Sequence, residues 1–237
     1  MLALERYARF SSEDREAVEG LLRSPLTRLR AGETVIHEGT SSPVIRVLSS
    51  GWAYRYKDLP DGRRQIVGFL LPGDLFNLHI RLREVDHTIA ALTPISFHTI
   101  PLAQFAALME RRANLSQAAL CNELVTSAIQ REWLVSLGQR SAFERLGHLF
   151  MELFTRLKLI GMTSGNSCGF PLTQNDLADA TGVTPVHLNR VMQDMRREKL
   201  VELRCKRLQI LDEDRLRNLA MFDAAYLQVR HESIEYQ

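Results

Sequence analysis

The stretch Thr173-Gln-Asn-Asp-Leu-Ala-Asp-Ala-Thr-Gly-Val-Thr-Pro-Val-His-Leu-Asn-Arg190 decides the fold of the C-terminal half. Its first four residues have the spacing of a capping box, which begins a helix. Thr181-Gly182 ends that helix. Thr184-Pro185 then begins a second one, because threonine suits the N-cap and proline suits the first helical position. Two short helices joined by a glycine turn are typical of a helix-turn-helix.

The second of these helices, which we expect to run to about Lys199, has one apolar and one polar face. A rotation of about 100° per residue puts Leu188, Val191, Met192 and Met195 on the apolar side. From His187 to Arg207 the sequence holds seven Lys or Arg and three Asp or Glu, so this segment carries +4. Clustered Lys and Arg are what contacts to DNA phosphates require.

The polar face and the segment after it predict a DNA-binding site. Arg190, one turn into the helix, can donate two hydrogen bonds to a guanine, while two short strands joined near Cys205-Lys206 would form a basic wing. Any one of these residues could be an ordinary surface residue, but the combination favours DNA. The candidate DNA-contacting residues are Thr173, Thr184, Pro185, Val186, His187, Asn189, Arg190, Gln193, Arg197, Arg204, Lys206 and Arg207.

The N-terminal half has a different texture. From about Leu29 to Ile100, short apolar runs alternate with turn residues, which indicates an antiparallel β-sandwich or roll. Asp61-Gly62 is the sharpest turn signal and is expected at the tip of a hairpin. In the second half, residues 161–169 are polar and glycine-rich and are expected to form a surface loop. The predicted fold class is α+β.

A long helix is expected between the two halves, from Asn114 to about Gly138, which is about 36 Å at about 1.5 Å per residue. One stripe along it has the 3,4 spacing of a coiled coil, and its polar Asn122 would fix the register of a pair. We therefore expect this helix to join two subunits through Leu115, Ala118, Asn122, Val125 and Ile129. A second apolar side is also present. The polar Asn122, Glu132 and Ser136 on the first stripe leave open the alternative of an internal helix buried on two faces.

These patterns divide the chain into three predicted segments. They are a β-roll sensor (1–112), a dimerisation helix with a hinge (113–140), and a winged helix-turn-helix DNA-binding domain (141–237).

The 237 residues carry a net charge of +2, which excludes a positive electrostatic field over the whole protein. Three scattered cysteines exclude a disulfide scaffold and a four-thiolate metal site within one chain. With neither a signal peptide nor an apolar run of roughly 20 residues, we expect a cytoplasmic protein with no membrane contact.

Catalytic motifs are missing as well. The chain holds no HExxH, no Gly-x-Ser-x-Gly and no phosphate-binding Gly-Lys-Ser/Thr loop, so we do not expect an enzyme. Two functions remain. The first is a sequence-specific DNA-binding regulator, and the alternative is a small-molecule, haem or redox sensor that acts mainly through protein partners.

In the order of its parts, the chain resembles the Crp/Fnr superfamily of bacterial transcription regulators over nearly its whole length. The matching stretches are Ala31-Gly-Glu-Thr-Val-Ile-His-Glu-Gly39, Pro60-Asp-Gly-Arg-Arg-Gln65, Leu71-Pro-Gly-Asp-Leu-Phe76, Ala91-Leu-Thr93, and Leu172 to Ala178 together with Asn189-Arg190. The resemblance implies a homodimer on a palindromic DNA site, signals received in the roll, and RNA polymerase as a protein partner.

The sequence departs from this family at the cyclic-nucleotide pocket. Cyclic-nucleotide binders follow Pro-Gly-Asp-x-Phe with Gly-Glu and later have Arg-Ser, whereas this chain has Asn77-Leu78 and Val85-Asp86. Leucine cannot hold a ribose and valine cannot neutralise a phosphate, so we do not expect control by cyclic AMP. The cysteine cluster that holds an iron–sulfur cluster in oxygen-sensing members is also absent. The acidic residue that precedes the recognition arginine in the best-known members is missing too, so their operator sequences cannot be assumed.

The signal is left open by the sequence. The residues placed near the expected effector pocket are Asn77, His79, Arg81, His87 and Thr88. Haem or metal ligation by His79 or His87 stays an alternative, although a structural role is the simpler interpretation. Cys205, among basic neighbours, is a redox candidate whose simpler interpretation is an inert wing residue. No metal ligand set is predicted.

Overall fold

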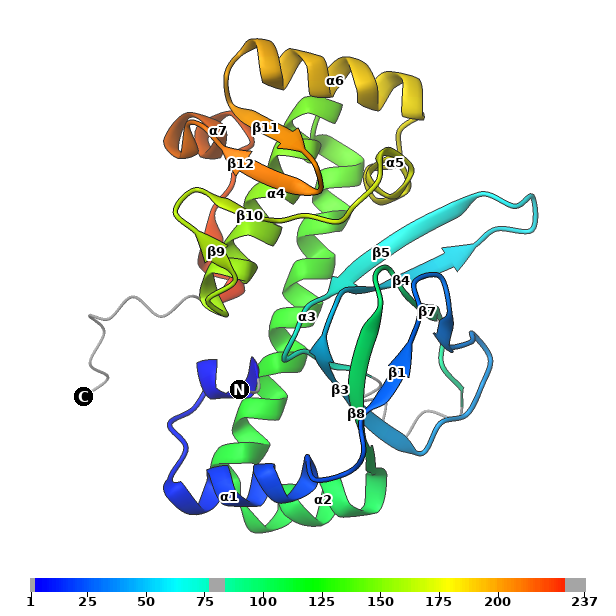
Figure 1. Cartoon of the computed structure of the whole chain (residues 1–237), viewed down its shortest axis with the longest axis vertical. Helices are drawn as coiled ribbons and strands as arrows, with labels where there is room; N and C mark the ends of the chain where they lie inside the picture. Colours follow the sequence, from blue (N-terminus) through cyan, green and yellow to red (C-terminus); the bar gives the residue numbers. More distant parts are fainter. Residues whose placement is uncertain (1–2, 77–83, 229–237) are drawn as a thin grey trace. The chain divides into compact units, whose positions relative to one another are not determined.

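The computed structural model describes residues 3–76 and 84–228, which form two compact units (Figure 1). Within the described part of the chain, the first unit holds residues 3–57, 68–76 and 84–126. The second holds residues 58–67 and 127–228. The first half of the long helix α3, Ala113–Gln139, belongs to the first unit, and its second half belongs to the second unit.

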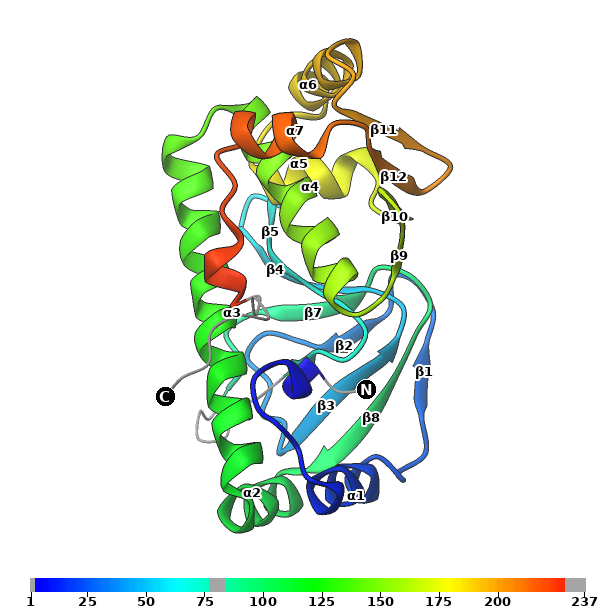
Figure 2. The same cartoon turned by 90° about the vertical axis from the view of Figure 1, so that its left-hand side faces the viewer.

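The first unit is built on two antiparallel sheets that face each other (Figure 2). One has the order β1-β8-β3-β6 and the other the order β2-β7-β4-β5. The strand bounds are β1 Thr27–Leu29, β2 Thr34–Ile36, β3 Val44–Ser50, β4 Ala53–Asp58, β5 Arg64–Leu70, β6 Leu75–Phe76, β7 Thr88–Ala91 and β8 Ile95–Pro101. Apolar side chains from both sheets, among them Leu48, Phe76, Ile89 and Phe97, form the core between them. The predicted antiparallel β architecture is confirmed.

The turn between β4 and β5 lies where the sequence predicts it. Gly62 has a φ of +85°, a left-handed conformation that glycine adopts at little cost, and its N–H donates to the carbonyl of Leu59 at 2.9 Å. Asp61 accepts hydrogen bonds from the backbone N–H of Arg63 and from its guanidinium. Asp61-Gly62 therefore forms the hairpin tip.

A second core of the first unit lies on the outer face of β3. The 3₁₀ helix Ala3–Arg6 and the helices α1 (Ser12–Leu21) and α2 (Leu102–Arg111) surround it. Ile45 and Val47 point into this core, and so do Leu115 and Ala118 from the start of α3. The core therefore fixes the first turns of α3 to the roll.

This packing corrects the predicted dimer stripe. Leu115 and Ala118 are fully buried in the first unit, and Asn122 and Val125 are only 6% and 7% exposed. Ile129 is half-buried. A heptad spacing shows that a helix side is apolar but cannot show whether the same subunit or a partner covers it. For most of this stripe the same subunit does.

The second unit begins with the second half of α3 and continues into α4 (Ala142–Leu159), α5 (Gln174–Thr181) and α6 (Pro185–Arg197). A four-stranded sheet has the order β11-β12-β10-β9. Its strands are β9 Thr163–Ser164, β10 Ser167–Gly169, β11 Val201–Arg204 and β12 Arg207–Ile210. The helix α7 (Glu213–Leu219) and the 3₁₀ helix η2 (Ala224–Leu227) follow. The predicted winged helix-turn-helix is confirmed, but the loop expected at residues 161–169 contains two strands of the wing sheet.

Candidate nucleic-acid interface

The helix-turn-helix is built by the local signals that the sequence carries. The Thr173 hydroxyl accepts from the N–H of Asp176 at 3.2 Å, and the Asp176 carboxylate accepts from the N–H of Thr173 at 2.7 Å. Gly182 ends α5 with a φ of +64°. The Thr184 hydroxyl then caps α6 by accepting from the N–H of His187 at 3.2 Å. These caps fix where α6 begins and therefore which of its faces is turned outward.

The inner face of α6 is apolar and buried, as predicted. Leu188 and Met195 are no more than 1% exposed, and Val191 and Met192 are also buried. Burying such side chains contributes roughly 1.5–3 kcal/mol each, so the helix is held on this side. Its other side is left to solvent.

All the residues that the sequence nominates for DNA contact are exposed in the structure: Thr173, Thr184, Pro185, Val186, His187, Asn189, Arg190, Gln193, Arg197, Arg204, Lys206 and Arg207. Val186 is 67% exposed, which is unusual for an apolar side chain and suits contact with a thymine methyl. Arg190 makes no hydrogen bond or ion pair with any residue that the structure describes. Contact with DNA stays a prediction for each of them.

Two of the polar side chains on α6 have partners within the unit. Arg197 pairs with Asp194 at 2.7 Å, and Asn189 accepts a hydrogen bond from Gln174 at 3.3 Å. Gln174 and the exposed Arg196 are additions to the predicted surface. The helical period of α6 predicts that Arg196 lies on the outer side of this helix. Gln174 belongs to α5, and only the structure shows that it lies beside Asn189 of α6.

The wing is a two-residue hairpin between β11 and β12. Cys205 and Lys206 have φ values of 50° and 57°, as the type I′ turn of a tight hairpin requires. Arg204 pairs with Glu202 at 2.8 Å, and Arg207 donates to the Ser167 hydroxyl at 3.2 Å. Lys206 is thus the wing cation at the tip, and Cys205 is exposed next to it.

The expected effector pocket is only partly described. Asn77, His79 and Arg81 lie outside the described residues. His87 is 8% exposed, and its Nδ1 lies 2.8 Å from a carboxylate oxygen of Asp86. The Thr88 hydroxyl accepts from the N–H of Glu38 at 3.2 Å. Within the described ranges, no three His, Cys, Asp or Glu side chains lie together as a metal site requires.

The connection between α3 and α4 is held by two arginines. Arg145, near the start of α4, donates to the carbonyls of Ser136 at 2.8 Å and Leu137 at 3.2 Å, at the end of α3. It also donates to the carbonyl of Thr181 at the end of α5. Gln65, in the β4–β5 hairpin, donates to the carbonyl of Asp179 in α5 at 2.8 Å. The free carbonyls at these helix ends are therefore satisfied by side chains.

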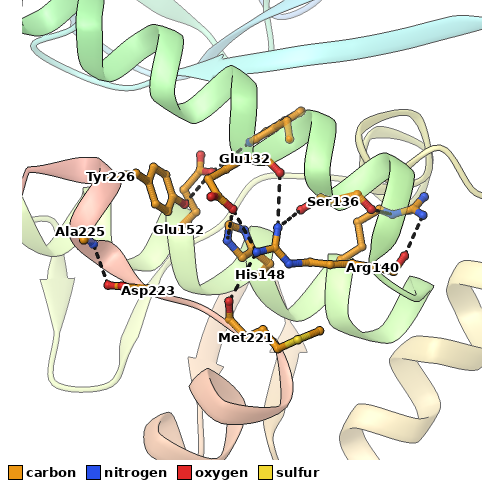
Figure 3. A network of polar contacts seen from close by, with 11 residues as sticks. Glu132, Ser136, Arg140, His148, Glu152, Met221, Asp223, Ala225 and Tyr226 are labelled. Carbon is orange, nitrogen blue, oxygen red and sulfur yellow. Dashed lines mark hydrogen bonds and ion pairs between the residues drawn. The ribbon is translucent and has the colours of Figure 1, made fainter.

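Arg140 lies in the connection itself (Figure 3). Its guanidinium donates to the Ser136 hydroxyl at 2.8 Å and to the Glu132 carboxylate at 3.0 Å, both on α3. His148 of α4 is 2% exposed and its Nε2 lies 3.5 Å from the same Glu132 carboxylate. Burial and the nearby charge of Arg140 lower the pKa of His148 to about 3, so this imidazole is neutral at pH 7.

Across the described residues, no helix combines the length and apolar character needed to span a membrane.

Two known domain families match this chain. The Crp-like helix-turn-helix domain matches residues 144–219, and the cyclic nucleotide-binding domain matches residues 26–112.

Curated relatives extend the match over most of the chain. The nitrogen fixation regulation protein FixK of Bradyrhizobium diazoefficiens is 31% identical, over 80% of this chain and 79% of its own length. The transcriptional activator protein FnrL of Cereibacter sphaeroides is 29% identical, over 75% of this chain and 73% of its own length. These relatives are transcription regulators and not enzymes, which confirms the expectation drawn from the missing catalytic motifs.

A solved structure confirms the fold. FixK2 from Bradyrhizobium japonicum aligns with a TM-score of 0.76 at 20% identity, over 84% of this chain and 98% of that one. The identity to FixK, the two matched domains and the outward face of α6 lead to one conclusion. The chain belongs to the Crp/Fnr family and is a DNA-binding transcription regulator.

Proposed function

We propose that this regulator binds DNA as a homodimer, with α6 of each subunit in the major groove of one half of a palindromic operator. The observation that carries this proposal is Arg190, which is exposed on the outer face of α6 and pairs with no residue in the described part of the chain. A guanidinium matches the O6 and N7 acceptors of guanine with two parallel hydrogen bonds. The exposed Lys206 suits contact with the phosphate backbone next to the groove. RNA polymerase is the protein partner that we propose.

The dimer surface that we propose is the exposed side of α3. Leu120, Leu124 and Leu134 are 61%, 58% and 71% exposed, and they fall on a heptad spacing. Large apolar side chains gathered on one helix side mark an interaction surface more often than a solvent face. This side replaces the predicted stripe, which the first unit largely buries.

The signal that we propose is not a cyclic nucleotide. At the position where cyclic-nucleotide binders have Arg-Ser, Val85 is 4% exposed and belongs to the core between the sheets. Asp86 follows it with an exposed carboxylate next to His87. A buried valine cannot neutralise a phosphate, and a carboxylate repels one. The described residues therefore do not fit that ligand, and the regulator responds to another signal or binds DNA constitutively.

Selection from random DNA with the purified protein tests the first proposal. We expect enrichment of a palindrome whose half-sites lie about one helical turn, roughly 34–36 Å, apart, because each subunit presents one α6. Recovery of unrelated sequences would contradict sequence-specific binding. Absorption spectra and mass spectrometry of protein purified from its native host show whether haem or a metabolite is bound.

Sedimentation tests the dimer surface. Leu124→Glu places a charge on the exposed side of α3, and we expect monomers at concentrations where the parent protein is dimeric. The matched control is Gln139→Glu, at an exposed position of α3 that lies off this heptad side. If Leu124→Glu remains dimeric, the subunits meet elsewhere.

A further inference from the structure

The C-terminal segment of the second unit lies against both α3 and α4. After α7 the chain continues through Met221, and Phe222 and Leu227 are only 5% and 4% exposed. The hydroxyl of Tyr226 donates to the Glu152 carboxylate of α4 at 3.1 Å. Phe222, Tyr226 and Leu227 therefore anchor this segment in the unit, whereas Met221, Asp223 and Ala225 are exposed (Figure 3).

Glu152 joins three elements at one carboxylate. The side chain is completely buried, and besides Tyr226 of η2 it accepts from the indole N–H of Trp133 on α3 at 3.0 Å. Arg156, one turn further along α4, approaches its other oxygen at 3.5 Å. Burial raises the pKa of Glu152 against the opposing effect of these partners. A buried carboxylate is costly unless its acceptor sites are filled, so the three donors have to remain in place together.

A second set of contacts ties the same segment to the connection between α3 and α4. His148 of α4 packs edge-on against Phe222 and is stacked on Tyr226, with ring centroids 5.2 Å and 5.8 Å apart. Arg140, in the connection, reaches the carbonyl of Met221 at 3.5 Å. The segment therefore contacts residues on both sides of the connection.

We propose that Met221–Leu227 is a latch that fixes α4, and the helix-turn-helix that it carries, on the second half of α3. Besides this segment, α3 and α4 are joined by the short stretch Arg140-Ser141, by the Arg145 hydrogen bonds to the carbonyls of Ser136 and Leu137, and by the Trp133–Glu152 hydrogen bond. Tyr226 and Trp133 meet at one oxygen of Glu152. Hydrogen bonds are directional, so this contact selects one angle between the helices, whereas apolar packing alone tolerates several. This inference rests on the proposed function, because the latch would act on DNA binding by fixing the position of α6.

The test compares Tyr226→Phe, which removes only the hydroxyl, with Tyr226→Ala, which also removes the ring. Spin labels at the exposed positions Gln130 on α3 and Asn218 on α7 report the distance across the connection, with Cys121 and Cys205 changed to serine. An excess of unlabelled protein keeps distances within one subunit dominant. Met221→Ala is the matched control, because that side chain is 55% exposed and its carbonyl contact with Arg140 is kept.

We expect a broader distance distribution for Tyr226→Ala, a smaller broadening for Tyr226→Phe, and none for Met221→Ala. Affinity for the selected operator should fall about tenfold in Tyr226→Phe, the factor that corresponds to one hydrogen bond to a charged group. A purely stabilising role would lower the melting temperature of the variants and leave the distances in the folded protein unchanged, and this result overturns the latch. If the parent protein selects no operator, the proposed function fails, and the distances still test the latch by themselves.

Discussion

The second unit contains two clusters of polar side chains that are built in opposite ways. On α6 and the wing, Arg190, Lys206 and their neighbours are exposed and several have no partner among the described residues. Around the connection between α3 and α4, Glu152 and His148 are buried and enclosed by other side chains. A charge in water is stable alone, whereas a buried charge needs partners. The exposed cluster thus suits an external ligand, and the buried cluster serves the internal geometry.

The largest expected effect belongs to the buried cluster. Glu152→Ala removes the buried carboxylate that accepts from Trp133 and Tyr226 and that lies 3.5 Å from the Arg156 guanidinium. Breaking a buried pair in this way costs about 3–5 kcal/mol, so the free energy of unfolding should fall by that amount. Urea denaturation followed by circular dichroism measures it.

A surface pair provides the control for this change. Glu202 on β11 pairs with Arg204, and both side chains are substantially exposed. Glu202→Ala should therefore cost less than about 1 kcal/mol. Equal losses for the two variants would show that the buried and exposed clusters do not differ as the structure indicates.

The second prediction concerns acid. The pKa of His148 is lowered to about 3 in the folded protein, while an unfolded histidine titrates near 6.5. Between these values the unfolded state binds one more proton, so stability falls as the pH falls, by about 1.4 kcal/mol per pH unit well below pH 6.5. The raised pKa of Glu152 acts in the opposite direction, because the folded state takes up that proton first.

The variant His148→Phe separates the two contributions. Phenylalanine keeps the aromatic contacts with Phe222 and Tyr226 but cannot be protonated. Glu132, Arg140 and Glu152 are unchanged, so the difference between the stability–pH curves of parent and variant isolates His148. Parallel curves between pH 4 and pH 7 would mean that this imidazole is not held neutral.

The sequence predicts the exposed cluster better than the buried one for a physical reason. The caps at Thr173 and Thr184, the left-handed Gly182 and the period of α6 are local, and each leaves a signature within a few residues. The hydrogen bonds from Trp133 and Tyr226 to Glu152 join residues that are far apart in sequence, so no local sequence pattern predicts them.

Helix α3 shows the same limit at another scale. The sequence shows two apolar sides on this helix, of which the structure buries Leu115 in the core of the first unit and leaves Leu124 exposed. Which side is covered depends on α1 and α2, which come from other parts of the chain and pack against the start of α3.

The sequence predicts a loop in place of the strands β9 and β10 for another reason. With two and three residues, they are too short to show an alternating pattern.

The third prediction concerns the exposed cluster. Arg190→Ala should weaken binding by about 1–3 kcal/mol and relax specificity at one base pair in each half-site, because Arg190 is free to read a base edge. The free energy of unfolding of this variant should change by less than about 0.5 kcal/mol, since the Arg190 side chain is exposed and forms no hydrogen bond or ion pair with the described residues. Binding titrations on single-base operator variants measure the first effect. Uniform weakening on all of them would assign Arg190 to the phosphates.

The smallest expected effect lies at the tip of the wing, where stability and binding should move in opposite directions. Lys206 has a φ of 57°, which is unfavourable for a residue with a side chain, and it is exposed. Lys206→Gly relieves this strain and should raise the unfolding free energy by up to about 1 kcal/mol. It also removes one proposed phosphate contact and should reduce the slope of log K against log salt by about 1.

The matched control is Lys199→Gly. Lys199 is also exposed and left-handed, with a φ of 53°, but it lies outside the wing, so this variant should gain stability with a smaller change in slope. Equal changes in slope for the two variants would mean that the basic charge acts as a general field, and that the wing does not contact DNA at Lys206.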